Sequence, residues 1–210
     1  MIARRTFLIG ATALLAVGLS GSFGLFARSA AAAGDPAGFI KKLGDEALAQ
    51  LVGSDITKAD RAERFRKLLV TNFDVPAIGK TVLGRYWKTA TPEEQQEYQK
   101  LFEDFLVGNY AQRFGQYAGE KFTTAGVREE GDGMHTVMTL IARPNGQTAR
   151  LDWLMRDDGD SYKILDLKIE GISMSETHRS EFASVIQNSG GKVAGLIDAL
   201  RKKTAQMNAG

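Results

Sequence analysis

The chain has 210 residues, of which 43% are hydrophobic and 25% are charged, a length and composition typical of a globular domain with a substantial core. It contains no cysteine, which excludes disulfide bonds, a cysteine nucleophile and a lipid-modified cysteine anchor. Its formal net charge at pH 7 is only +2, which by itself gives weak support for a nucleic-acid partner.

The first 33 residues have the pattern of a secretory signal peptide. Arg4 and Arg5 precede a long uncharged stretch that ends in a run of alanines, and we expect cleavage after Ala33. The paired arginines are typical of twin-arginine export, but a Sec signal explains them as well. Cleavage removes three arginines and no acid, so the mature charge is −1 and no nucleic-acid partner is expected. We predict one exported domain at 34–210.

The mature domain is predicted to begin with three helices. Apolar residues at steps of three and four predict helices over 35–53 and 60–72. Asp74 is placed to cap a short helix over 75–83, which Gly84 ends. A loop then leads into a longer helix.

That longer helix has an unusually aromatic face. Thr91 is the predicted N-cap, Pro92 takes the first helical position and Glu94 completes a capping box. The residues that share one face are Tyr98, Leu101, Phe102, Phe105, Leu106, Tyr110, Phe114 and Tyr117. This stripe is either ordinary core or the wall of a cavity for an apolar ligand, and the residues alone leave both open. We count the helical part as 35–117.

A period of two replaces the helical period after residue 119. The predicted strands are 121–128, 134–143, 149–156 and 162–169, joined by turns rich in Gly, Asn and Asp. On the third, Leu151, Trp153 and Met155 alternate with charged residues, so one face is wet and the other faces the helices. The fold class is α+β, with helices packed on a twisted four-stranded antiparallel meander at 121–169.

Two further helices are predicted after the sheet, within 174–203. The first covers 174–187, with Ser173 or Ser175 as its cap, and the second covers 193–203. The tail beyond Lys203 is expected to fray.

Residues suited to catalysis are sparse. His135 and His178 are the chain's two histidines, and we expect both on the solvated surface. Asp152 and Asp166 lie on neighbouring strands, where a buried carboxylate pair would suit an exported enzyme, but pairing of Asp152 with Arg150 or Arg156 is the simpler interpretation. The standard nucleotide, hydrolase and zinc motifs are absent. We therefore predict no catalytic site, no metal and no cofactor.

Several segments resemble one family in their residues and their order. They are LGRYWKTATP at 83–92, RLDW at 150–153, EGISM at 170–174, Glu181-Phe182, and Gly190-Gly191 followed by Leu196, Ile197 and Leu200. Together they resemble the MlaC family, also called the toluene-tolerance or auxiliary transport component family. A related branch is associated with hopanoid lipids, and these motifs do not separate the branches.

The resemblance implies a periplasmic carrier that holds phospholipid acyl chains in an apolar cavity between helices and sheet. It also implies two partners, an inner-membrane ABC transporter complex and an outer-membrane lipoprotein complex, and a role in outer-membrane lipid asymmetry. We expect a monomer. The alternatives are a carrier of another lipid, hopanoid-like or related to hydrophobic solvents, and an exported enzyme on the same scaffold.

If a hydrophobic cavity lies between the aromatic helix and the apolar face of the sheet, the residues on those faces are its expected lining. The expected lipid-binding residues are Leu83, Tyr86, Trp87, Phe102, Phe105, Tyr110, Phe114, Val137, Leu151, Trp153, Met155, Ile172 and Met174. The head group is expected to stay near the mouth, in water.

Overall fold

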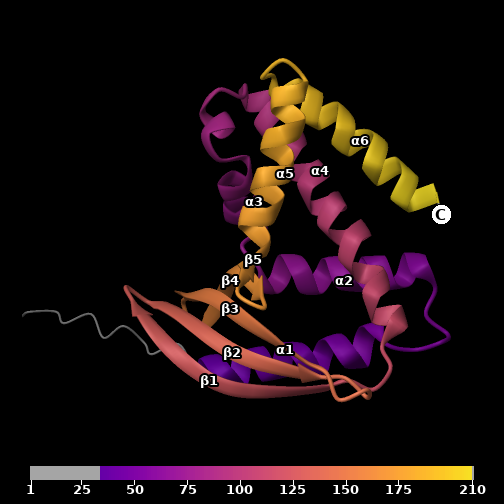
Figure 1. Ribbon diagram of the computed structural model, residues 1–210, viewed down its shortest axis with the longest axis vertical. Helices are drawn as coiled ribbons and strands as arrows, with labels where there is room; N and C mark the ends of the chain where they lie inside the picture. The colour runs from indigo at the N-terminus through magenta and orange to yellow at the C-terminus, as the bar shows by residue number, and fades with distance from the viewer. Residues whose placement is uncertain (1–33, 210) are drawn as a thin grey trace, which may run out of the picture. The chain divides into compact units, whose positions relative to one another are not determined.

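Capping side chains begin most of the helices at the predicted places. The computed structural model describes residues 34–209, so the predicted signal peptide lies outside the described residues. The helices are α1 (Pro36–Leu51), α2 (Lys58–Asn72), α3 (Val75–Leu83), α4 (Pro92–Tyr110), α5 (Met174–Asn188) and α6 (Val193–Ala209), with 3-10 segments η1 (Gly84–Lys88) and η2 (Ala111–Gln116) (Figure 1). The capping side chains that accept hydrogen bonds from first-turn N–H groups are those of Asp35, Thr57, Asp74, Thr91 and Ser173.

The capping box predicted for α4 is present. The Glu94 N–H donates to the Thr91 hydroxyl at 3.2 Å, and the Thr91 N–H donates to the Glu94 carboxylate at 2.9 Å. Gly84 ends α3 with φ of 58°, a backbone conformation that favours glycine. Tyr86 and Trp87, predicted in a loop, lie in the 3-10 turn η1 that follows at once.

The sheet is an antiparallel meander, as predicted, with one short strand more. Its strands are β1 (Lys121–Gly131), β2 (Met134–Ala142), β3 (Thr148–Asp158), β4 (Ser161–Ile169) and β5 (Ile172–Ser173), and their order in space follows the sequence. The predicted count was four because β5 has only two residues, too few for a period to show. Glu170 and Gly171, with φ of 52° and 80°, turn the chain back onto β4.

A β-bulge explains why β4 carries apolar residues on both sides. Leu154 lies opposite Asp166, but Met155 lies opposite Ile164, so Leu165 has no partner on β3. The extra residue switches the parity of the strand. Ile164 on one side of the bulge and Leu167 on the other can therefore face the helices together.

The buried apolar residues of the described chain form two separate cores. The helical core is built by α3, α4, α5 and α6, and includes Phe102, Phe182 and Leu196. The sheet core is built by α1 and the inner face of the sheet, and includes Ile40 and Met155. Helix α2 lies between them (Figure 1), and its neighbouring residues Leu68 and Leu69 are assigned to the sheet core and the helical core respectively.

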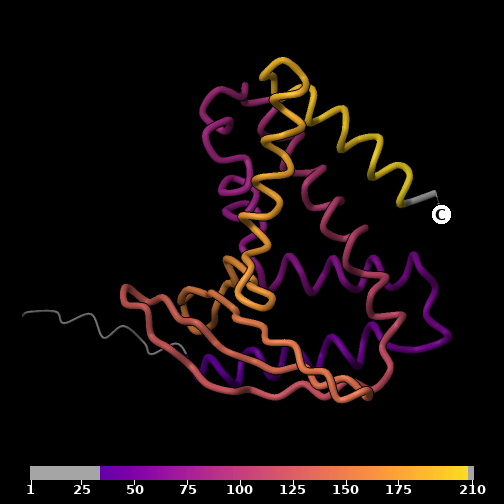
Figure 2. Tube along the Cα trace, in the orientation of Figure 1, coloured from indigo at the N-terminus to yellow at the C-terminus, as the bar shows by residue number. Residues whose placement is uncertain are grey.

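The junction of α2 and α3 ties the two cores together. The Asp74 N–H donates to the Ile164 carbonyl at 3.0 Å, and Phe73 forms a parallel bridge with the same residue, so this turn lies against the edge of β4 (Figure 2). The Asp74 carboxylate caps α3 through the Ala77 N–H at 3.1 Å and accepts from Arg156 of β3 at 2.8 Å. One aspartate thus begins a helix and anchors it to the sheet.

The prediction that the chain frays beyond Lys203 was wrong, because α6 continues to Ala209. Thr204 is buried, and Met207 packs against the helical core. A Cβ on Gly108 of α4 would lie 2.8 Å from the Met207 side chain, so the glycine leaves room for this contact. Tertiary packing extends the helix where its own sequence pattern has faded.

Within residues 34–209, each helix is too short or too polar to cross a bilayer.

We predict that replacing Asp74 separates its two roles. Asp74→Ala should lower the free energy of unfolding by about 1–2 kcal/mol, since the cap and the ion pair are both lost. Asp74→Asn should cost less, because asparagine caps as well as aspartate. Urea denaturation at pH 7 measures both, and equal losses would mean that the Arg156 contact, not the cap, dominates.

The same contacts predict a pH dependence. Burial disfavours the charged form of Asp74, but hydrogen bonds from Arg156 and from the Ala77 N–H outweigh it and lower the pKa of this carboxyl. Its contribution is therefore present above the ordinary aspartate pKa of about 3.9 and is lost as the pH falls below it. The difference between wild type and Asp74→Asn should shrink from pH 7 to pH 3.

Candidate functional site

The N-terminal half of the aromatic face of α4 is solid core. Phe102 has no accessible surface, and its ring lies 5.7 Å from Tyr98 and 6.2 Å from Phe182, measured between ring centroids. Phe105 packs edge-on against Phe182 at 5.4 Å. The Tyr98 hydroxyl donates to the Gly79 carbonyl at 2.9 Å, and burial raises its pKa. Side chains of the protein itself fill this region.

The C-terminal half of the same face is partly open. Tyr110 and Phe114 are half-buried. The Phe114 ring lies 5.9 Å from Phe65 of α2, and Phe65 packs against both cores. Phe73 also packs against both. Aromatic surface therefore remains accessible where the helical core and the sheet core meet.

The inner face of the sheet carries both fully buried side chains and a partly accessible tryptophan. Val137 and Met155 have no accessible surface, whereas Trp153 is half-buried. The Trp153 ring NH donates to the Thr139 hydroxyl at 2.9 Å, and its ring lies 6.5 Å from Phe122. This hydrogen bond holds the indole in one orientation, in which part of its surface remains accessible to solvent.

We call the half-buried rings at the meeting of the two cores the aromatic junction. Its members are Phe65, Phe73, Tyr110, Phe114, Phe122 and Trp153. Phe65 and Phe73 pack against both cores, Tyr110 packs against the helical core, and the other three pack against the sheet core, so distant parts of the chain contribute partly accessible apolar surface. Such a surface is suited to a non-polar ligand because contacts with it need no fixed direction.

The structure distributes the predicted lining residues between the two cores. Those in or against the helical core are Leu83, Tyr86, Trp87, Phe102, Phe105 and Tyr110. Those in or against the sheet core are Phe114, Val137, Trp153 and Met155. Leu151 is buried on β3, and Met174 is half-buried at the start of α5. Ile172 lies apart, with 62% of its surface exposed.

Two pockets open on the described surface. One, of about 390 Å³, adjoins the aromatic junction at Phe73 and is lined by Val70, Phe73, Val75, Pro76, Gln99, Lys100 and Glu103. The other, of about 290 Å³, lies on the wet face of the sheet and is lined by Arg128, Glu130, Thr136, Asp152, Leu154 and Lys168. The lining of the first combines apolar side chains with the charged Lys100 and Glu103, which fits a ligand of mixed polarity.

The predicted surface position of His178 was wrong, and sequence reasoning missed that it lies among aromatic rings. Its side chain is 11% exposed and lies among rings, 5.3 Å from Phe105 and 6.3 Å from Tyr110. His135 was misplaced in the same way, at 16% exposed. The signal was available, since Met174, His178 and Phe182 are four apart and so share one face of a helix.

The two carboxylates that a catalytic pair would need have different hydrogen-bond partners. Asp152 accepts two hydrogen bonds from Arg150, at 2.7 and 2.9 Å, which confirms the simpler interpretation. Asp166 accepts from the Ser175 N–H at 3.1 Å. Within residues 34–209, clusters of three or more metal-binding side chains are also absent.

Comparisons with known proteins agree with this geometry. The family model described as MlaC protein matches residues 41–202. The toluene tolerance protein ttg2D of Pseudomonas putida is 21% identical over 145 residues, which are 69% of this chain and 67% of that one. The intermembrane phospholipid transport system binding protein MlaC of Haemophilus influenzae is 22% identical over 191 residues, or 87% and 88% of the two chains.

A solved structure is also similar. It is the phospholipid-binding protein from Ralstonia solanacearum in complex with a phospholipid. The TM-score is 0.73 at 27% identity, and the match covers 83% of this chain and 99% of that one. The arrangement of helices on an open antiparallel sheet is therefore one that holds a phospholipid in that protein.

We predict that the two halves of the aromatic face differ in their contribution to stability. Phe102→Ala should lower the free energy of unfolding of the lipid-free protein by about 3–5 kcal/mol, because it leaves a cavity in a filled core. Phe114→Ala should cost under about 2 kcal/mol, because part of the ring is already in contact with solvent. Urea denaturation tests this, and equal costs would place Phe114 in plain core.

Proposed function

The chain belongs to the MlaC family, and from this premise we propose that it is a periplasmic carrier whose bound phospholipid places its acyl chains on the aromatic junction. The partly exposed rings between the two cores are the observation that supports this proposal most directly. An acyl chain laid between the cores would cover apolar surface on both sides at once. The phospholipid in the similar Ralstonia structure supports the same ligand class.

The energetics of the cargo explain why such a carrier is needed. Burial of each CH₂ stabilises by about 0.8 kcal/mol, so a chain of about fifteen carbons gains on the order of 12 kcal/mol in a bilayer. A carrier has to replace most of the stabilisation that the acyl chain loses when it leaves the bilayer. It also has to release the lipid at its destination. Non-directional contacts with rings such as Phe114 and Trp153 meet both demands, because they tolerate chains of different length.

The route of transport is part of the proposal. The carrier would receive or deliver phospholipid at an inner-membrane ABC transporter complex and at an outer-membrane lipoprotein complex. The name of the Haemophilus relative, an intermembrane phospholipid transport system binding protein, supports this assignment. The predicted signal peptide, with cleavage after Ala33, supports a periplasmic location.

The first test identifies the ligand directly. The mature protein, purified from the periplasm of its host without detergent, should yield phospholipid on solvent extraction and mass spectrometry. Trp153→Asp, which puts a charge on the aromatic junction, should yield much less, whereas Met138→Asp, on the opposite, wet face of the sheet beside Asp152, should yield as much as wild type. A hopanoid or another lipid in place of phospholipid would change the cargo, and recovery of none would contradict the carrier.

The two tryptophans provide a second test of where the acyl chains lie. Trp153 belongs to the aromatic junction, and Trp87 lies in η1 against the helical core. In Trp87→Phe, the remaining Trp153 fluorescence should be quenched strongly by phospholipid brominated on its acyl chains. In Trp153→Phe, the remaining Trp87 should be quenched much less. Equal quenching of the two would place the chains elsewhere.

A further inference from the structure

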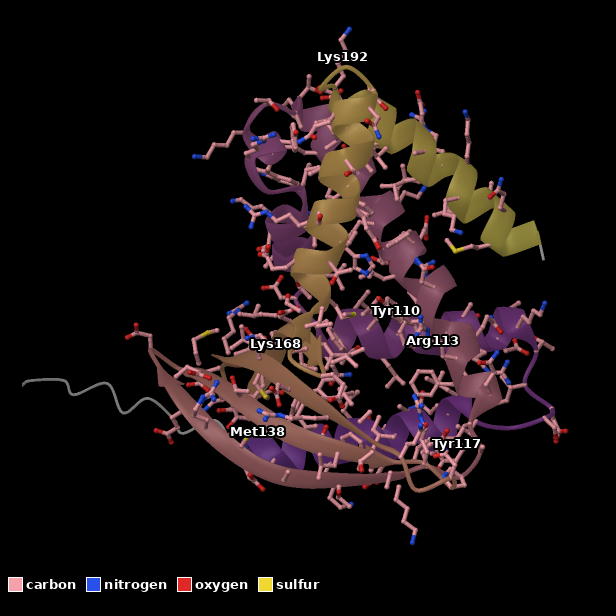
Figure 3. The ribbon with its side chains drawn as sticks, viewed as in Figure 1. Tyr110, Arg113, Tyr117, Met138, Lys168 and Lys192 are labelled. Atoms are coloured by element: carbon pink, nitrogen blue, oxygen red, sulfur yellow. The ribbon has the colours of Figure 1, made fainter. Side chains whose placement is uncertain are left out.

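We propose that Tyr110, Arg113 and His178 hold the phosphate of the bound phospholipid at the edge of the aromatic junction. This inference rests on the proposed function and names the polar part of the same ligand. The three residues come from α4, η2 and α5, and Figure 3 shows Tyr110 and Arg113 next to each other where α4 passes into η2.

Tyr110 and His178 form a polar pair inside an otherwise apolar wall. The Tyr110 hydroxyl lies 3.0 Å from His178 Nε2, and His178 Nδ1 lies 3.1 Å from the Glu181 carboxylate. The hydroxyl also lies 4.0 Å from the Met174 Sδ, a weak acceptor. Burial raises the pKa of Tyr110, so its hydroxyl is protonated and available as a donor.

Arg113 adds a positive charge beside this pair. Its guanidinium lies 5.2 Å from the centroid of the Tyr110 ring, and its Nε donates weakly to the Asn109 carbonyl at 3.4 Å. It is exposed and makes no ion pair within residues 34–209. A cation and a hydroxyl donor without a carboxylate partner, at the rim of an apolar surface, are suited to an anionic oxygen.

The hydrogen-bond arrangement links this anion to a proton. When His178 is neutral and its Nδ1–H donates to Glu181, Nε2 accepts the Tyr110 hydrogen, so the hydroxyl cannot donate to a ligand. When His178 is protonated, Nε2–H donates to the Tyr110 oxygen and frees the hydroxyl hydrogen for a phosphate oxygen. Phosphate binding through Tyr110 therefore needs a hydrogen on His178 Nε2, which the protonated imidazole supplies while it keeps its Nδ1–H bond to Glu181.

The charges around His178 agree with this coupling. Within the described chain, the titratable groups that face it are Glu181 from its own helix and Tyr110 from α4, with Arg113 of η2 over the Tyr110 ring. The rings of Phe105 and Phe182 also lie beside it, and they carry no charge. The protonated imidazole would then lie between the Glu181 carboxylate and the lipid phosphate, a favourable order of charges.

The test compares two soluble lipids that differ in the phosphate. Dihexanoyl phosphatidylglycerol and dihexanoylglycerol are titrated into the mature protein at pH 5.5 and 7.5, with inorganic phosphate alone as a third ligand. Wild type should bind the phospholipid at least about tenfold more tightly than the diacylglycerol, as expected for charge-assisted hydrogen bonds. Tyr110→Phe and Arg113→Gln should remove most of that preference, so that each variant binds the two lipids with nearly equal affinity.

The chain offers a matched control for each residue. Tyr117→Phe removes a hydroxyl that donates to the Glu120 carbonyl, and Arg85→Gln removes another exposed arginine stacked on a tyrosine. Both control variants should keep the phosphate preference of the wild type. Phospholipid affinity should rise from pH 7.5 to 5.5 in wild type and in His135→Gln, but not in His178→Gln. His135 has the corresponding aspartate partner, Asp157, at 2.9 Å.

The outcomes separate this inference from the proposed function. If both lipids bind wild type and the Tyr110 and Arg113 variants keep the full phosphate preference, the phosphate site is wrong and the carrier stands. If inorganic phosphate binds as tightly as the phospholipid, the cluster is a site for free phosphate, not for the lipid. If neither lipid binds wild type, the carrier and this site are both wrong.

Discussion

The separation of the apolar residues into two cores is the constraint on which the rest of this structure depends. A helix or a sheet with one apolar face has to cover that face, and α1 does so for the sheet while α3, α4, α5 and α6 do so for one another. Helix α2 serves both cores but cannot close the space between them completely. Rings such as Phe114 and Trp153 therefore keep part of their surface accessible in a protein that is otherwise well packed.

The link between the cores has to be firm for this surface to persist. The α2–α3 turn supplies it through Asp74, which is bonded to the backbone of β4 and to Arg156 of β3. Arg66 of α2 supports it from the other side through ion pairs with Glu103 and Asp104 of α4. Hydrophobic contacts have no fixed direction, so these polar anchors are what fix the positions of α2 and α3 relative to the sheet and to α4.

A carrier benefits from having few polar groups on its binding surface, but not from having none. An all-apolar wall would hold any apolar chain, whereas under the proposed function the Tyr110–His178–Glu181 network would provide donors at one edge of the binding surface. The burial of His178 among rings would be costly if its two nitrogens lacked partners, and both have one. The same arrangement makes the polar edge sensitive to protonation, which non-directional contacts are not.

Local signals in the sequence determined the secondary structure well. The caps at Asp74 and Thr91 and the alternation along β3 have causes within a few residues, so the helices and the meander were predictable. The length of α6, the two-residue β5 and the bulge at Leu165 depend on contacts with other elements, and these were missed.

The sequence by itself also determined the family, because its motifs, such as LGRYWKTATP at 83–92, are spread along almost the whole domain in the family's order. Only the tertiary structure decided which aromatic residues are filled core and which stay accessible. Phe102 and Phe114 lie on one helical stripe and look alike in sequence, but Phe182 covers the first and nothing covers all of the second in the described chain. Periodicity reports which way a side chain points, whereas burial depends on what another element places opposite it.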